Sequence, residues 1–410
     1  MNQYLSRREK LYKDMSDNTL LVVFAGEQIK RSADSHYMFE VSKNFYYLTG
    51  IDEPDAILCC VKQNQIVKEY LFIRDIDPIM EKWNGKYISK EEAITISDIQ
   101  TVHYLSSFQS MLARLVTRNQ INRVYVDNER IRKDDIASAS ERFAYEVTQK
   151  WLLPVENMYQ KVAALRAIKD ETEIDKIKKA IELTNQAFLH MLKKTKPQIH
   201  EYKLQAEFEY ILKSNNAKPA FDMIVAASNR ACVLHYVTNQ EEIDDHSLIL
   251  TDMGANLAHY NSDITRTFPS NGVFNKRQKE LMEVVLEAME LVFAACKPGV
   301  TLLQLNQIVV KHYQKKLIEL NIIKSPEEVS DYYYHGVSHF LGLDVHDVGQ
   351  MENTQLQPGH VITVEPGLYV AQENIGIRIE DDILITETGY ENLSKQIIKT
   401  PQEIEQFMNQ

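Results

Sequence analysis

The N-terminal part of the chain alternates short apolar runs with stretches of mixed polarity. The apolar runs at residues 20–26, 56–61 and 123–127 predict strands, and residues 111–119 predict a helix before the last strand. Strands that alternate with helices are typical of α/β domains. We therefore predict an N-terminal α/β domain over residues 1–155.

A different pattern follows and predicts a second domain over residues 156–410. Residues 155–200 have apolar positions at helical spacing and many charged residues, and Pro197 would end a helix there. This pattern predicts one long amphipathic helix. Further helices are expected at residues 275–296 and 301–320. The other apolar runs predict strands that also hold polar residues, namely DMIVAAS, VLHYV, LILTDMGA, SDITRTF, VITVEPGLYV and IGIRIEDDILIT. Strand blocks thus flank a helical middle, and a duplication is conceivable, although no clean repeat is visible.

Composition and charge exclude several classes of function. The net charge is −12 at pH 7, the pI is near 5.6 and the lysines are scattered, which argues against a nucleic-acid partner. No stretch approaches the ~18 apolar residues of a membrane-spanning helix. The N-terminal segment lacks the apolar core of a signal peptide, so we expect a cytoplasmic protein. The four cysteines lack CxxC spacing, which argues against a thiolate metal site.

Two aspartates of the second domain lie inside predicted strands. Asp252 and Asp263 are 11 positions apart, which fits neighbouring strands of a hairpin that present both carboxylates to one point. Alone, each would be better explained as a strand-end or turn residue. Together they repel, and a cation such as Mn, Mg, Co or Zn would remove the repulsion.

Three histidines and two glutamates extend this set. His335, His339 and His346 fall within twelve residues of a Gly-rich segment, although a lone histidine would usually be an ordinary core or surface residue. Glu365 and Glu380 lie in apolar β-patterned runs, where an unpaired carboxylate is strongly destabilising, so a metal or cationic partner is expected.

Four carboxylates and one imidazole suit a pair of divalent ions roughly 3.5–4 Å apart with a bridging water or hydroxide as nucleophile, which predicts a hydrolase. Arg378 precedes Glu380 by two residues and should share its strand face as a partner, unless it forms a surface salt bridge. His235 in VLHYV is a fourth histidine for proton transfer or for binding the scissile carbonyl, with a surface strand histidine as the alternative.

These residues lie in motifs that resemble the pita-bread metallopeptidases, most closely the aminopeptidase P family. The segments are VLHY, LTDMGA, SDITRTFPSNGVF, HGVSHFLGLDVHDVG, LQPGHVITVEPGLYV and IGIRIEDDILITETGYENLS, with SRREKL, RSADSHYMF and NFYYLTGIDEPDA nearer the N-terminus. The resemblance implies an α/β protein, with an N-terminal creatinase/aminopeptidase P-type domain followed by a C-terminal pita-bread catalytic domain.

The resemblance also implies a role for each matched residue. Two metal ions, usually manganese, would be bound by Asp252, Asp263, His339, Glu365 and Glu380, and the bridging ligands would be Asp263 and Glu380. The catalytic residues would be Glu365 as the base, His346 as the donor near the scissile carbonyl, His235 and Arg378. Asp34 of RSAD and Tyr369 of PGLYV would join Arg378 and Asp252 in a polar network around the metals.

The implied substrates are peptides with proline at the second position. Proline lacks an N–H and fixes φ, so peptidases that bind an extended, hydrogen-bonded substrate reject it. The substrate-binding residues would be His235, His335, His346 and Arg378, with Phe221 as an apolar wall or a packing residue. The family forms homodimers or homotetramers, so one of these assemblies is expected.

Two segments of the N-terminal domain bear on this resemblance. Residues 38–41 read Met-Phe-Glu-Val where the family commonly reads Pro-Phe-Arg-Gln, so Glu40 reverses a charge that could lie at a subunit interface or near substrate. Trp83 matches a tryptophan that relatives place near the site, or it is a packing residue.

Other members of the pita-bread class are the main alternatives. A prolidase has the same ligands but is confined to dipeptides; Ser338, where prolidases usually have glycine, and RSAD favour aminopeptidase P. Non-catalytic pita-bread binding modules and metal-free creatinase typically lack ligands that this sequence retains. Methionine aminopeptidase lacks such an N-terminal domain.

Overall fold

The structure, a computed structural model, describes residues 2–129, 136–349 and 353–410. The chain divides into two compact units, Met1–Arg166 and Ala167–Gln410. The sequence-based boundary at residues 155 and 156 falls inside the last strand of the first unit. Within the described residues, no helix is long and apolar enough to cross a membrane.

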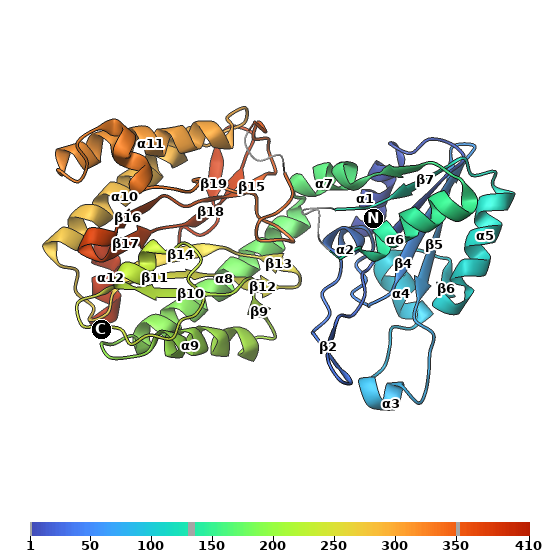
Figure 1. The fold of residues 1–410 in the computed structure, drawn as a ribbon, viewed down its shortest axis with the longest axis horizontal. Helices are drawn as coiled ribbons and strands as arrows, with labels where there is room; N and C mark the ends of the chain where they lie inside the picture. Colours follow the sequence, from blue (N-terminus) through green and yellow to red (C-terminus); the bar gives the residue numbers. More distant parts are fainter. Residues whose placement is uncertain (1, 130–135, 350–352) are drawn as a thin grey trace. The chain divides into compact units, whose positions relative to one another are not determined.

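The first unit is built on a six-stranded sheet with the order β6-β5-β4-β1-β7-β8 (Figure 1). β1 pairs antiparallel with β4 and parallel with β7, so the sheet is mixed. The predicted strands are confirmed as β1, β4 and β7, because their continuous apolar runs are buried on both faces. The strands are β1 (Thr19–Phe24), β4 (Ile57–Gln63), β5 (Ile66–Ile73), β6 (Val102–Tyr104), β7 (Arg123–Val126) and β8 (Val155–Asn157).

Helices pack their apolar side chains against this sheet. The predicted helix is confirmed as α5 (Phe108–Arg118), whose Phe108, Leu112 and Leu115 join the core formed by the strands. The other elements of the unit are α1 (Gln3–Tyr12), β2 (Lys30–Ser32), β3 (Ser35–His36), α2 (Lys43–Thr49), α3 (Glu81–Asn84), α4 (Lys90–Ser97), α6 (Ala139–Glu146) and α7 (Tyr159–Ala167).

The single long helix predicted near residues 155–200 is wrong, because the chain forms two helices there. α7 ends at Ala167 and α8 (Glu171–Lys194) begins after Asp170, whose side chain accepts a hydrogen bond from the Glu173 backbone in a capping box. The Lys169 backbone N–H donates to the Gly359 carbonyl at 2.8 Å, outside any helical ladder. A strong N-cap therefore starts a new helix inside a continuous amphipathic pattern.

The second unit contains two groups of strands, each with its own pair of helices. α8 and α9 (Glu201–Ser214) pack on the first group, and α10 (Lys276–Ala295) packs on the second and on α11 (Leu302–Glu319). In Figure 1 the two helix pairs lie on opposite sides of the strands. The predicted later helices are confirmed as α10 and α11, and a last helix, α12 (Pro401–Met408), follows the second group.

The first strand group holds the sheets β10-β11-β14 and β13-β12-β9, and the second holds β15-β18-β19 and β16-β17. The first group consists of β9 (Lys218–Pro219), β10 (Ile224–Ala227), β11 (Leu248–Met253), β12 (Ala255–Leu257), β13 (Tyr260–Asn261) and β14 (Ile264–Pro269). The second consists of β15 (Val361–Val364), β16 (Gly367–Val370), β17 (Ile375–Arg378), β18 (Asp381–Ile385) and β19 (Tyr390–Asn392). Both groups contribute polar side chains to one site.

Three predicted strands of this unit differ from the structure. VLHYV is a turn that follows a short 3-10 helix, η3 (Ser228–Cys232), so the strand predicted there is wrong. The runs 361–370 and 375–386 are each split in two, at Glu365-Pro366 and at Ile379-Glu380. In both split runs a glutamate occupies the break, where its side chain is freed from the alternation of a regular strand.

Gly254, between β11 and β12, has no room for a side chain. A Cβ there would lie 2.0 Å from the Ser262 carbonyl oxygen. We expect Gly254→Ala to lower the free energy of unfolding by about 2 kcal/mol or more, because the backbone must move to relieve the overlap. Gly389→Ala, where a Cβ meets nothing within 4 Å, should change it by less than about 0.5 kcal/mol in the same urea titration. Equal effects would contradict this account of Gly254.

Candidate metal centre

Three residues from both strand groups meet at one point in the second unit. Asp263 directly precedes β14, His339 lies in the segment before β15, and Glu380 occupies the break between β17 and β18. One ligand atom from each lies within 4.8 Å of the others. The His339 Nε2 atom is 3.4 Å from Asp263 Oδ2 and 4.0 Å from Glu380 Oε1.

Glu365 and Asp252 adjoin this trio. Glu365 follows β15, and its Oε1 atom is 3.6 Å from His339 Nε2. Asp252 lies in β11, paired in register with Thr265 of β14. The charge of Asp252 raises the pKa values of Asp263, Glu365 and Glu380. The strands β11 and β14 are neighbours, as expected, but Asp263 lies just outside its strand and the connection holds the further hairpin β12-β13.

Burial and mutual repulsion dominate the electrostatics of this cluster. Burial raises the pKa values of Asp263 and Glu380 well above their usual range, and neighbouring carboxylates raise them further. Burial also raises the pKa of Glu365 to about 8. The pKa of His339 is lowered to about 4, mainly by burial, so its imidazole is neutral at pH 7 with a lone pair free to bind a cation.

The donor set fits divalent cations. Asp252 Oδ1 and Asp263 Oδ1 are buried and have no hydrogen-bond partner among the residues that the structure describes. A buried carboxylate oxygen without a donor is strongly destabilising unless a cation compensates it. Carboxylates with one neutral imidazole are ligands for hard or borderline divalent ions. The structure therefore supports a cation site on chemical grounds.

Threonines beside the ligands orient them. The Thr265 hydroxyl donates to Glu380 Oε2 at 2.6 Å, and the backbone N–H of His339 donates to Thr363 Oγ1 at 3.2 Å. Sequence reasoning missed both threonines. Each lies two residues from a predicted ligand, Thr265 after Asp263 and Thr363 before Glu365, and this strand period could have indicated a shared face.

Arg378, at the end of β17, forms its ion pair with Asp252 rather than with Glu380. Its Nη2 atom donates to Asp252 Oδ2 at 2.6 Å, and its Nη1 atom donates to the Tyr369 hydroxyl at 3.1 Å. The predicted pairing with Glu380 fails because β17 ends at Arg378 and the chain turns before β18. Asp252 thus has one oxygen held by Arg378 and one without a hydrogen-bond partner.

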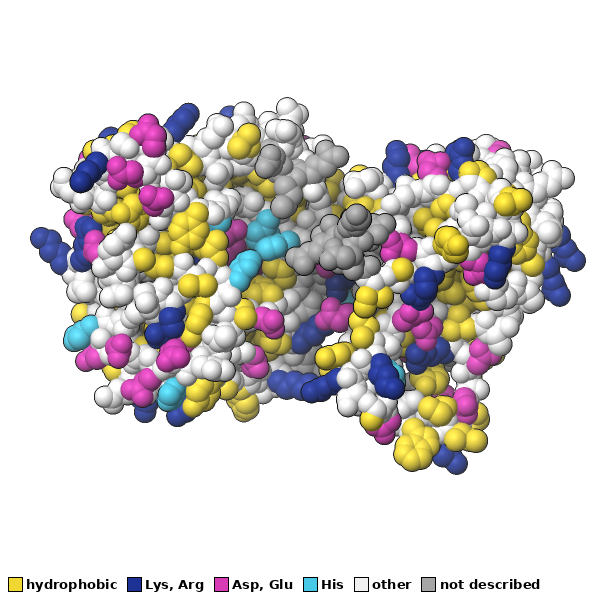
Figure 2. Space-filling view, in the orientation of Figure 1, with side chains coloured by type: hydrophobic (Ala, Val, Ile, Leu, Met, Phe, Trp, Pro, Cys, Tyr) yellow, Lys and Arg dark blue, Asp and Glu magenta, His cyan; other side chains and the backbone are white. Residues whose placement is uncertain are grey.

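Three more histidines lie beside this centre. His335 Nε2 is 2.9 Å from the Tyr369 hydroxyl, and its Nδ1 is 3.8 Å from Glu365 Oε2. The His346 ring centroid is 4.3 Å from that of His339. His235 is exposed, and its charge lowers the pKa values of His335 and His346, so the three are neighbours. Histidine side chains gather on the surface of this unit in Figure 2.

The remaining predicted residues lie farther from these contacts or in the other unit. Phe221 is half-buried between β9 and β10, and Ser338 Oγ is buried without a hydrogen-bond partner beside His339. Asp34 is exposed between β2 and β3 of the first unit, so its predicted place beside Arg378 stays a prediction. Trp83 in α3 is 82% exposed within that unit, so it does not pack there.

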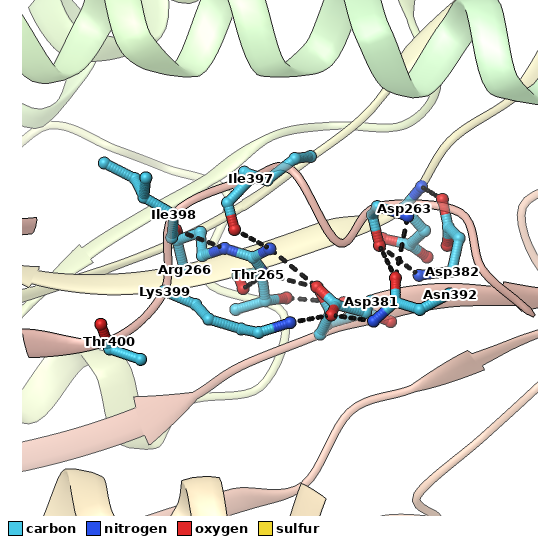
Figure 3. Close-up of polar contacts among 12 residues, drawn as sticks. Asp263, Thr265, Arg266, Asp381, Asp382, Asn392, Ile397, Ile398, Lys399 and Thr400 are labelled. Atoms are coloured by element: carbon cyan, nitrogen blue, oxygen red, sulfur yellow. Dashed lines mark hydrogen bonds and ion pairs between the residues drawn. The ribbon is translucent and has the colours of Figure 1, made fainter. Parts of the chain in front are cut away.

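A buried charged network lies behind the ligands (Figure 3). Arg266 of β14 is fully buried, and its guanidinium donates to the Glu380 carbonyl at 2.6 Å and to Asp381 Oδ1 at 2.7 Å. Asp381 also accepts from Lys399 and Asn392. Burial alone would raise the pKa of Asp381, but the positive charges of Arg266 and Lys399 hold it below its usual range. Sequence reasoning missed this network, which binds the backbone of Glu380 and not its carboxylate.

Comparison with known proteins agrees with this geometry. The sequence model of metallopeptidase family M24 matches residues 175–387, and that of the aminopeptidase P N-terminal domain matches residues 4–125. The chain belongs to metallopeptidase family M24. It is thus a hydrolase, a metal-dependent exopeptidase with a pita-bread catalytic domain.

Individual M24 relatives match the whole chain. The Xaa-Pro aminopeptidase of Escherichia coli K12 is 34% identical and covers 99% of this chain and 97% of its own length. A Bacillus anthracis structure described as an aminopeptidase P is 42% identical, with a TM-score of 0.97 over 100% of this chain and 99% of that one. Zinc-substituted Escherichia coli aminopeptidase P with bound product is 33% identical, with a TM-score of 0.91 over 99% and 98%.

The network behind the ligands generates a stability prediction for this M24 fold. We expect Asp381→Asn to lower the free energy of unfolding by about 3 kcal/mol or more, because it leaves the buried Arg266 guanidinium without its counter-charge. Lys399→Met should cost only about 1 kcal/mol, because Lys399 is partly exposed and Asp381 keeps Arg266. Urea unfolding at pH 7 measures both. A larger loss for the Lys399 variant would show that the pairing with Arg266 is not dominant.

Proposed function

We propose that this metallopeptidase removes the N-terminal residue from peptides whose second residue is proline. The observation that carries the proposal is the match to Xaa-Pro aminopeptidase over almost the whole chain, N-terminal domain included. The clustered carboxylates and neutral imidazole agree with it. A prolidase or a non-catalytic binding module is not favoured by these relatives.

Five residues would bind two divalent ions in this proposal. They are Asp252, Asp263, His339, Glu365 and Glu380, with Asp263 and Glu380 as the bridging ligands. Manganese is the proposed ion on the resemblance to aminopeptidase P, and the carboxylate donors agree with hard or borderline divalent ions in general. When bound, the ions supply a nucleophilic water and positive charge for the oxyanion of the transition state.

The protein's own groups would handle protons and orient the substrate. Glu365, whose pKa burial raises to about 8, would accept the proton of the attacking water. His346, exposed beside His339, would donate to the scissile carbonyl oxygen. Arg378 would orient Asp252 through their 2.6 Å contact.

The proline ring would lie among His335, His346 and Arg378, with His235 at the exposed edge and Phe221 as an apolar wall. Tyr369 supports this arrangement, because its hydroxyl contacts both His335 and Arg378. An imide nitrogen offers no N–H to a backbone acceptor, so selection would rest on the shape of this pocket.

We also propose a homodimer or homotetramer. Met38 and Trp83 of the first unit are 79% and 82% exposed in the single chain, and such large apolar side chains suit an interface. The cytoplasmic location stays a prediction from the sequence.

The buried charges predict how metal affects stability. Removing metal from the protein should lower its melting temperature by roughly 5–10 °C, because at 100 times the Kd a ligand adds about 2.7 kcal/mol. Asp263→Asn should melt at or above the temperature of the metal-free protein, because the raised pKa of Asp263 means that its ionised form destabilises the fold at pH 7.

Manganese should then give Asp263→Asn no further stabilisation and no activity. His339→Ala should likewise lose bound metal and activity together. Asp245→Asn, at a side chain that is 57% exposed, is the matched control and should respond to manganese as the unsubstituted protein does. Full metal binding in the Asp263 or His339 variant would refute the ligand assignment.

A comparison of two substrates tests the specificity. With manganese present, the protein should release arginine from Arg-Pro-Pro, and a Gly-Pro dipeptide should be the poorer substrate, because an aminopeptidase binds residues beyond the proline. Chromatography of the free amino acids measures both reactions. Turnover of the dipeptide alone would establish a prolidase instead, and an Arg-Ala-Ala control should stay intact.

A further inference from the structure

The segment that carries His235 has no regular secondary structure. Residues 233–240 follow η3 and form neither a helix nor a strand, and the side chains of Val233, His235 and Val237 are exposed. Leu234 and Tyr236 of this segment pack against the buried cluster around Ile224 and Leu250, but a segment without backbone pairing gains little rigidity from a ladder. The position of His235 therefore depends on whatever anchors the segment.

One buried carboxylate supplies that anchor. Glu201, the first residue of α9, is fully buried. Its Oε1 atom accepts hydrogen bonds from the Ala227 N–H at 3.1 Å and from Arg230 Nε at 2.8 Å. Its Oε2 atom accepts from the Tyr236 hydroxyl at 2.8 Å and from the Glu241 N–H at 3.1 Å. A carboxylate has about four lone-pair positions, so Glu201 is fully satisfied.

The four donors hold the His235 segment at both ends and in its middle. Ala227 and Arg230 precede it, Glu241 follows it, and Tyr236 is the neighbour of His235 in sequence. A second buried side chain, Asn239, adds three hydrogen bonds. Its amide donates to the Met223 carbonyl at 2.7 Å and to Gln205 Oε1 of α9 at 2.9 Å, and its Oδ1 atom accepts from the Val225 N–H at 3.0 Å. Charge-assisted bonds to a buried acceptor are the stronger kind, which makes Glu201 the principal anchor.

The 3-10 helix η3, which leads directly into this segment, packs beside the candidate metal centre. The Tyr334 hydroxyl donates to the Cys232 carbonyl at 2.5 Å, and Tyr334 packs on Tyr369 with ring centroids 5.0 Å apart. A Cβ at Gly376 of β17 would lie 2.5 Å from the Ala231 carbonyl, so η3 lies directly against the strand that carries Arg378. Any movement of this segment therefore displaces His235 relative to fixed neighbours.

We propose that Glu201 is a positioning residue that holds residues 233–241 so that His235 faces the substrate site. It touches neither the metal ligands nor the substrate, and it acts through the segment. This inference rests on the proposed function for the role of His235, but not for the anchoring itself. A carboxylate outside the substrate site would then contribute to the specificity of that site.

Glu201→Gln is the direct test, because it removes the charge and replaces one acceptor oxygen with a donor. We expect the KM for Arg-Pro-Pro to rise about tenfold, because the loss of one charge-assisted hydrogen bond has an effect of this size. The kcat should stay within about twofold of that of the unsubstituted protein. The manganese affinity of the metal-free protein, measured by calorimetry, should stay within about twofold of that of the unsubstituted protein. Amide hydrogen exchange should accelerate in residues 233–241 and not around Asp263 and Glu380.

A double-mutant cycle with His235→Ala separates positioning from general stability. In the His235→Ala background, Glu201→Gln should raise KM by less than about twofold, because the group that it positions is gone. An equal tenfold rise in both backgrounds would overturn the proposal. Glu207→Gln, on the same helix but with its carboxylate beside His190 of α8, is the matched control and should leave KM and exchange unchanged.

Tyr236→Phe keeps the test decisive if Glu201→Gln does not fold. It removes one donor and leaves the carboxylate with three, so the fold persists and a smaller rise in exchange over residues 233–241 is expected. Tyr210→Phe, at a 63% exposed tyrosine, is its control. The proposed anchoring by Glu201 would be wrong if hydrogen exchange over residues 233–241 stayed unchanged in Tyr236→Phe and also in Glu201→Gln, provided that the latter folds. Faster exchange in a protein that leaves Arg-Pro-Pro intact would instead refute only the proposed function.

Discussion

The repulsion among buried carboxylates in the second unit is the constraint on which the rest of its structure depends. Asp263 and Glu380 are fully buried together, and Asp252 and Glu365 add their charges. Such a cluster is destabilising in a folded chain unless a cation compensates it. The fold bears this cost by fixing each ligand on a separate strand end, so that the ligands cannot separate to relieve the repulsion. A preorganised, electronegative site is the consequence.

Two arginines show how the protein supports these charges without cancelling them. Arg378 binds one oxygen of Asp252, and the other oxygen has no hydrogen-bond partner among the described residues. Arg266 lies behind the site and binds the Glu380 carbonyl and Asp381, not the Glu380 carboxylate. Both guanidiniums therefore fix the positions of ligands while leaving carboxylate oxygens for the metal. An arginine placed against the carboxylates of Asp263 and Glu380 would compete with a cation.

The sequence was informative wherever a residue contradicted its local pattern. Acids inside apolar runs indicated Asp252, Glu365 and Glu380, because local chemistry alone makes them costly. It was less informative where a distant partner decides the structure. VLHYV has the composition of a strand, but Glu201, far back in the chain, binds its neighbours and leaves it a turn. Likewise, Arg266 looks like an ordinary strand residue until β18 and residues 397–398 surround it.

The site therefore divides into two parts that are held by different physical means. The proposed metal ligands adjoin or belong to strands, where ladders of backbone hydrogen bonds fix their positions. His235, which is proposed to contact the peptide, lies on an exposed segment outside any ladder. A buried carboxylate with several donors gives that segment rigidity while its outer face remains in solvent. An irregular segment can thus contribute to a precise site when buried side chains hold it on one face and its other face stays exposed to solvent.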